Sequence, residues 1–123
     1  MFERTKPIKE TRPERRTDLE ITLCQAMQSK KRVRLHYKNE FHFRSFEPYI
    51  LYLEGTGKVL VHGVQTKDDL NRALGKDLCS FEVRLLNSVI LIKEAFEYHG
   101  TVAPFKLKLG TDIICTVDSL SLY

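Results

Sequence analysis

The chain of 123 residues has no long hydrophobic run: its longest purely aliphatic stretch, residues 89–92, is far below the roughly 20 apolar residues of a membrane-spanning helix. The first four residues, which include Glu3 and Arg4, are not followed by an apolar stretch, so no secretory signal peptide is expected. A chain of this length has room for one domain, which excludes a large multidomain enzyme.

The sequence also lacks the short motifs that accompany common catalytic chemistry. It contains no G-x-S-x-G, no glycine-rich phosphate loop and no H-E-x-x-H. Its histidines show no paired ligand spacing and have no cluster of acids and cysteines beside them. We therefore predict a protein that is not an enzyme and has neither a metal site nor a cofactor. The four histidines are His36, His42, His62 and His99.

Cysteine is scarce and widely spaced. The three residues are Cys24, Cys79 and Cys115, and no two of them form a C-x-x-C pair. An odd number of cysteines in a chain without a signal peptide favours free thiols in a reducing cytoplasm. We expect each thiol to pack as a small hydrophobic group in the core.

What is present is an ordinary globular composition with a mild basic excess. Hydrophobic residues make up 42% and charged residues 29%, and 20 Lys and Arg against 16 Asp and Glu give a net charge of +4. This balance permits nucleic acid or another polyanion as a partner. Residues 1–16 are basic and nearly devoid of apolar side chains, which predicts a flexible arm.

A helix is predicted over residues 18–30. Thr17 and Glu20 have the spacing of a capping box, in which a hydroxyl and a carboxylate three residues later satisfy the first backbone N–H groups. Apolar residues then recur at helical spacing, namely Leu19, Leu23, Ala26 and Met27.

Beyond the helix the hydrophobic period changes to two, which is typical of strands. We expect strands at residues 32–38, 41–53, 58–64, 79–85 and 89–92, with a bend at Pro48, a loop at 65–77 and a C-terminal hairpin from 105–109 and 113–117. One helix followed by five antiparallel strands predicts an α+β, mainly β fold, in which a strongly bent sheet closes into a barrel.

Residues 19–97, about two-thirds of the chain, resemble the WYL domain of bacterial regulators. The matching stretches are residues 23–37, 44–51, 57–63 and 81–89. They carry an arginine-rich strand ending in Tyr37, an arginine before a Glu-Pro pair, and a closing strand with Phe81. The resemblance implies an SH3-like or Sm-like barrel with a leading helix, and divides the chain into an arm (1–16), a WYL-like domain (17–97) and a C-terminal extension (98–123).

The chain departs from the family pattern at several positions. The Trp-Tyr-Leu positions that name the family fall on Lys58, Val59 and Leu60. The two arginines of the closing strand fall on Glu82 and Leu85, while an arginine stands at Arg84 instead. No helix-turn-helix is expected ahead of the barrel.

The best candidate ligand contacts are Tyr37 and Arg44, which match positions in the ligand-binding region of the family. Arginine offers a planar fork for phosphate and tyrosine a stacking face for a base. The alternative is that Tyr37 is a core aromatic and that Arg44 pairs with Glu47. A basic stripe on the first strand either tracks a phosphate backbone or is simply a solvated face. Its members are Arg32, Arg34, His36 and Lys38.

Lys58, His62 and Arg84 complete the predicted ligand site, since Lys58 and His62 share a strand face and Arg84 lies in the closing strand. Two functions remain open at this point. One is a ligand-sensing module that binds single-stranded nucleic acid or a nucleotide and regulates a partner protein, in transcription or defence. The other is a non-enzymatic adaptor or dimerisation domain that has lost the family ligand.

Overall fold

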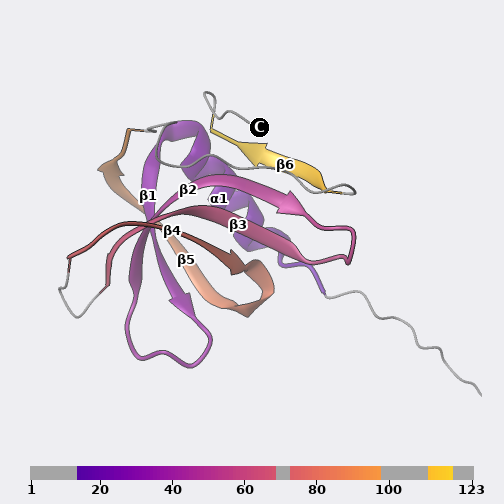
Figure 1. Cartoon of the computed structure of the whole chain (residues 1–123), viewed down its shortest axis with the longest axis horizontal. Coiled ribbons are helices and arrows are strands. Elements are labelled where there is room, and N and C mark those ends of the chain that lie inside the picture. Colours follow the sequence, from indigo (N-terminus) through magenta and orange to yellow (C-terminus); the bar gives the residue numbers. More distant parts are fainter. Residues whose placement is uncertain (1–13, 69–72, 98–110, 118–123) are drawn as a thin grey trace, which may run out of the picture.

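The computed structural model describes residues 14–68, 73–97 and 111–117, in which one helix precedes a six-stranded antiparallel sheet (Figure 1). None of its helices has the length and apolar character needed to cross a bilayer in the part of the chain described. The elements are α1 (Thr17–Ser29), β1 (Lys31–Tyr37), β2 (Arg44–Leu53), β3 (Val59–Asp68), β4 (Ala73–Glu82), the short 3₁₀ helix η1 (Val83–Leu85), β5 (Leu86–Ala95) and β6 (Asp112–Thr116).

The sheet has the strand order β4-β3-β2-β1-β5, and β6 is added to β2. This confirms the predicted α+β, mainly β fold with a leading helix. Between the described residues, β4 and β5 form no strand pairing and are instead joined by η1, so the bent sheet remains open rather than closing into a fully hydrogen-bonded barrel.

The central strand β2 changes neighbour along its length. It pairs with β3 from end to end, with β1 through Arg44–Phe46 and with β6 through Ile50–Leu53. Between those two stretches Pro48 has no N–H to donate, and the register with β3 shifts between Pro48 and Ile50. The predicted bend at Pro48 is therefore confirmed, and it frees one edge of β2 for a late strand.

The helix agrees with the prediction to within one residue at each end. Its apolar stripe is buried: Leu23, Ala26 and Met27 have no exposed surface. Lys30 ends the helix in the left-handed conformation, with φ of 54°. The predicted capping box is wrong, because Arg16 is the N-cap residue and no side chain caps the helix. The carboxylate of Glu20 instead binds the guanidinium of Arg15 at 2.5 Å, a charged partner stronger than a backbone N–H.

Several strand boundaries also differ from the prediction. Much of the expected loop at 65–77 is strand, since β3 continues to Asp68 and β4 starts at Ala73. Their polar side chains lack the apolar alternation of a half-buried strand. β4 ends at Glu82, where η1 begins, and β5 is longer than residues 89–92. For the C-terminal hairpin, residues 113–116 are confirmed as strand within β6, whereas 105–109 lie outside the described residues.

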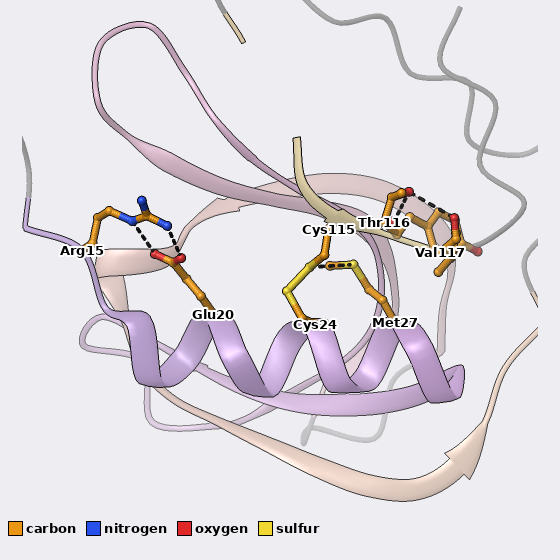
Figure 2. The surroundings of a disulfide bond; sticks show 8 residues. Arg15, Glu20, Cys24, Met27, Cys115, Thr116 and Val117 are labelled. Carbon is orange, nitrogen blue, oxygen red and sulfur yellow. Dashed lines mark hydrogen bonds and ion pairs between the residues drawn. A yellow bond between two sulfur atoms is a disulfide. The ribbon is translucent and has the colours of Figure 1, made fainter. Parts of the chain in front are cut away.

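The expectation of three free thiols is wrong. Cys24 of α1 and Cys115 of β6 form a disulfide, while Cys79 is not part of it (Figure 2). The two bonded residues are 91 positions apart, so neither local spacing nor an odd count reveals the pair. All three cysteine side chains pack against the core, but each is only partly buried.

Candidate functional site

The alternation of β1 puts the side chains of Arg34 and His36 on one face of the sheet, as predicted. Val33 and Leu35 are fully buried, so Arg34 and His36 point to the opposite side. Both contact the ring of Phe43: the guanidinium carbon of Arg34 lies 5.1 Å from the ring centroid, and the His36 ring centroid lies at 5.1 Å. The guanidinium distance is that of a cation–π contact.

The turn between β1 and β2 carries an uncovered aromatic side chain two residues before Phe43. Phe41 is fully exposed, with a relative accessibility of 101%, and Lys38 in the same turn is also exposed. Burying such a ring in a complex would contribute roughly 1.5–3 kcal/mol, a free energy that remains to be gained by binding. We call this region the basic-aromatic surface; its residues are Arg34, His36, Lys38, Phe41 and Phe43.

The turn is held in place by polar contacts to neighbouring elements. The Nε2 of His36 lies 2.6 Å from the backbone oxygen of Glu40, and the side-chain amide of Asn87 lies 3.1 Å from its Nδ1. The backbone N–H of Lys38 donates to the carbonyl of Leu85 at 2.9 Å. These contacts fix the turn against η1 and the start of β5, so the basic-aromatic surface rests on a supported scaffold.

Tyr37 and Arg44, the two best sequence candidates, converge on Phe81 of β4. The ring centroids of Tyr37 and Phe81 are 5.3 Å apart, and the guanidinium carbon of Arg44 lies 6.0 Å from the Phe81 centroid. The guanidinium also makes two hydrogen bonds with the carboxylate of Glu40, one of 2.9 Å, and one of 2.9 Å with the side chain of Gln65.

The carboxylate bound to Arg44 is therefore that of Glu40, and the expected pairing with Glu47 is wrong. The hydrogen bond from Arg44 lowers the pKa of Glu40 below its usual value. A phosphate that approached Arg44 would have to displace this carboxylate. Glu40 and Arg44 are four residues apart, and the turn between β1 and β2 brings their side chains together. The predicted strand over residues 41–53 does not anticipate this contact.

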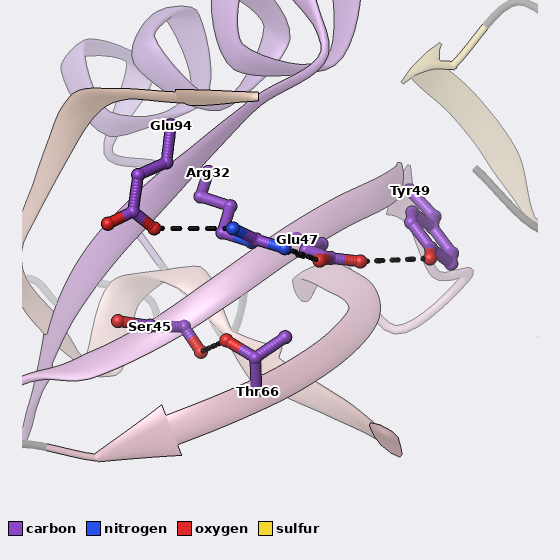
Figure 3. A network of polar contacts seen from close by, with 6 residues as sticks. All are labelled: Arg32, Ser45, Glu47, Tyr49, Thr66 and Glu94. Carbon is purple, nitrogen blue, oxygen red and sulfur yellow. Dashed lines mark hydrogen bonds and ion pairs between the residues drawn. The ribbon is translucent and has the colours of Figure 1, made fainter. Parts of the chain in front are cut away.

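Arg32 has a structural partner. Its guanidinium is 2.9 Å from the carboxylate of Glu47, which is only 2% exposed, and 3.3 Å from that of Glu94 (Figure 3). The hydroxyl of Tyr49 donates to the same Glu47 at 3.2 Å. The side chain of Arg32 thus neutralises a buried charge, which sets it apart from the other members of the basic stripe.

The structure does not gather the remaining predicted residues into one site. Lys58 is exposed in the turn after β2, at the opposite end of that strand from Arg44. Arg84 lies in η1, close to the β1–β2 turn, and its Nε is 2.5 Å from the carboxylate of Glu82. His62 lies in the middle of β3, with Nδ1 2.9 Å from the hydroxyl of Ser80.

Burial lowers the pKa of His62 below its usual value. The unfolded chain therefore takes up a proton on this side chain at a higher pH than the folded domain does. Its contribution to stability is complete above the unfolded pKa of about 6.5 and declines as the pH falls below it. We expect the melting temperature to drop more between pH 7.5 and pH 5 in the wild-type protein than in His62→Gln, measured by circular dichroism. Equal drops would contradict this prediction.

Among the described residues, no group of three or more histidine, cysteine or acidic side chains is arranged to hold a metal ion. Comparison with known proteins found no matching family model, no matching curated protein and no matching solved structure. The resemblance to the WYL domain therefore stays a prediction that rests on the residues of this chain.

Proposed function

We propose that this protein is a WYL-like regulatory module that binds single-stranded nucleic acid or a nucleotide through the basic-aromatic surface and thereby modulates a partner protein. The observation that carries this proposal is the fully exposed ring of Phe41 in the same turn as Phe43, whose ring contacts Arg34 and His36. Base stacking on aromatic rings combined with cationic side chains is the common mode of single-strand binding.

Three further features favour this ligand class. Every base has a π-face, so a single exposed ring can stack on a base without selecting a sequence. The net charge of +4 attracts a polyanion at long range. Arg34 and Lys38 can contact phosphates on either side of a stacked base, and a guanidinium suits the phosphate geometry.

The second candidate function, a protein–protein adaptor, is favoured by a different observation. Arg32, Arg44 and Arg84, three of the predicted phosphate contacts, are ion-paired with carboxylates of the same chain. An exposed aromatic side chain also suits a protein interface. In that case Phe41 would insert into a partner protein and salt would have little effect on binding.

Titration of fluorescently labelled oligothymidylate and oligouridylate, followed by anisotropy at two salt concentrations, tests the proposal. Phe41→Ala should weaken binding roughly 5- to 150-fold, the loss of one stacked base, with an unchanged salt dependence. Arg34→Ala should make the log–log salt slope shallower by about 0.7, the value for one phosphate on a single strand. Arg44→Ala should change the affinity little, because Glu40 already occupies the guanidinium of Arg44.

The matched control is Ile21→Ala, which removes an apolar side chain of α1 that is 60% exposed and lies outside the basic-aromatic surface. This variant should bind like the wild type. Absence of binding at tens of micromolar protein in low salt, or equal losses for Phe41→Ala and Ile21→Ala, would argue for the adaptor instead.

A further inference from the structure

The last described strand, β6, is short, and it is held by its pairing with β2, by one disulfide and by the packing of Ile114, Cys115 and Val117 against the core. It is five residues long, its side chains are exposed or only partly buried, and its pairing within the described residues is with β2 alone. Beyond that pairing, the N–H of Val117 and the hydroxyl of Thr116 donate to the carbonyl of Tyr49 at 3.0 and 3.1 Å. The disulfide between Cys24 and Cys115 is the covalent bond that ties this strand to α1 (Figure 2).

A groove of about 380 Å³ between α1 and β6 reaches the helical half of this disulfide. Its volume is at the lower end of the range for small-molecule sites. The one charged side chain in its wall, Glu20, is neutralised by Arg15 at 2.5 Å, so the groove does not repel a thiolate through an uncompensated carboxylate. The lining residues are Thr17, Glu20, Ile21, Cys24, Gln25, Gln28 and Ile114.

We propose that the Cys24–Cys115 disulfide is a reversible redox switch that controls the attachment of β6. A low-molecular-weight thiol enters the groove and its thiolate attacks Sγ of Cys24. The bond between the two cysteines breaks, and Cys115 leaves as a thiolate that takes up a proton. A second thiol then attacks the mixed disulfide at the sulfur of the first, releases Cys24 as a thiol and forms the oxidised disulfide of the reductant. Two electrons pass from two thiols to the protein.

Reduction removes the covalent tie to α1 and leaves β6 attached by its short pairing with β2 and by the core contacts of Ile114, Cys115 and Val117. Because isolated pairing of a five-residue strand is weak, we expect β6 to detach and to expose the edge of Ile50–Leu53. Detachment also frees the backbone carbonyl of Tyr49. The side-chain hydroxyl of the same residue donates to Glu47, the buried partner of Arg32 (Figure 3). The change is therefore expected in β6 and β2, while β3 keeps its pairing with β4.

Hydrogen exchange measured by mass spectrometry on the full chain tests this switch, in buffers with oxidised or reduced glutathione in excess. In reduced glutathione, amides of residues 112–117 should exchange at least about ten-fold faster, whereas those of residues 59–66 should not change. Cys115→Ser should show the fast exchange in both buffers, and Cys79→Ser, the matched control, should behave as the wild type.

The point of attack is tested on the wild-type protein, in which the groove is intact. After brief exposure to reduced glutathione and quenching with acid, peptide mass spectrometry should find the mixed disulfide on Cys24 rather than on Cys115, because Cys24 lines the groove. Three results would overturn the proposal: a wild-type disulfide that glutathione cannot reduce without denaturant, fast exchange throughout the domain on reduction, or unchanged protection of residues 112–117. The wild-type measurements decide the matter even if a cysteine variant fails to fold.

Discussion

Replacing Gly63 by alanine is expected to lower the free energy of unfolding by about 3 kcal/mol, which is the upper end of the usual cost of overpacking. Gly63 of β3 lies opposite Pro48 of β2, where the register of the two strands shifts. A Cβ at this position would lie 2.0 Å from the backbone oxygen of Glu47 and 2.8 Å from the ring of Phe46. Because the nearest atom belongs to the backbone, relief of this clash requires the two strands to separate.

The free energy of unfolding from urea denaturation measures this loss, which should also lower the melting temperature by roughly 10 °C for a domain of this size. Gly55→Ala is the matched control: Gly55 lies in the exposed turn after β2, and its φ is outside the left-handed region. The control should stay within about 0.5 kcal/mol of the wild type. A Gly63→Ala protein with nearly wild-type stability would show that β2 and β3 are not as closely apposed here as described.

The parts of this fold that could be predicted are those with a local signal. The helix over Thr17–Ser29 follows from apolar residues at helical spacing, and β1 follows from the alternation of Val33 and Leu35 with basic residues. Pro48 marks the bend of β2 because its missing N–H acts at that residue alone. In each case the physical cause lies within a few residues of its effect.

The features that escaped prediction depend on contacts between distant segments. The disulfide joins residues 24 and 115, and the partner of Arg32 is 15 positions away on β2. Polar residues at 65–68 form strand because β4 supplies the hydrogen bonds, an effect that periodicity does not report. Sequence patterns thus indicate which segments are strands, but not which charges meet.

The basic part of the candidate site could be predicted from the sequence, but its aromatic part could not. The basic stripe on β1 follows from alternation, and Arg34 is retained in the basic-aromatic surface. Phe41 and Phe43 escape the prediction because residues 41–53 are predicted as one strand, in which residues two apart share a face that can pack on the core. The signal that could have identified them is two aromatics close to Asn39, a turn-favouring residue, directly after a basic strand.

Replacement of Arg32 by methionine is expected to cost about 3 kcal/mol, which would distinguish a structural from a ligand-binding arginine. Its Nε donates to the carboxylate of Glu47 at 2.9 Å, its Nη2 lies 2.9 Å from the same oxygen, and Glu47 is 2% exposed. Methionine keeps the apolar stem but leaves a buried charge with the hydroxyl of Tyr49 as its remaining described donor. Removing one member of a buried pair typically costs 3–5 kcal/mol, and we take the lower value because the Arg32 side chain is 29% exposed.

The double variant Arg32→Met, Glu47→Leu removes both charges and should recover to within about 1 kcal/mol of the wild type, since an apolar pair of similar volume avoids the desolvation cost. Urea denaturation of the two single variants and the double variant gives the coupling energy directly. The folded double variant should also bind oligothymidylate with the wild-type salt slope, because Arg32 lies outside the basic-aromatic surface. If Arg32→Met costs less than about 1 kcal/mol and makes the salt slope shallower by one phosphate, then Arg32 contacts the ligand and the surface extends along the whole of β1.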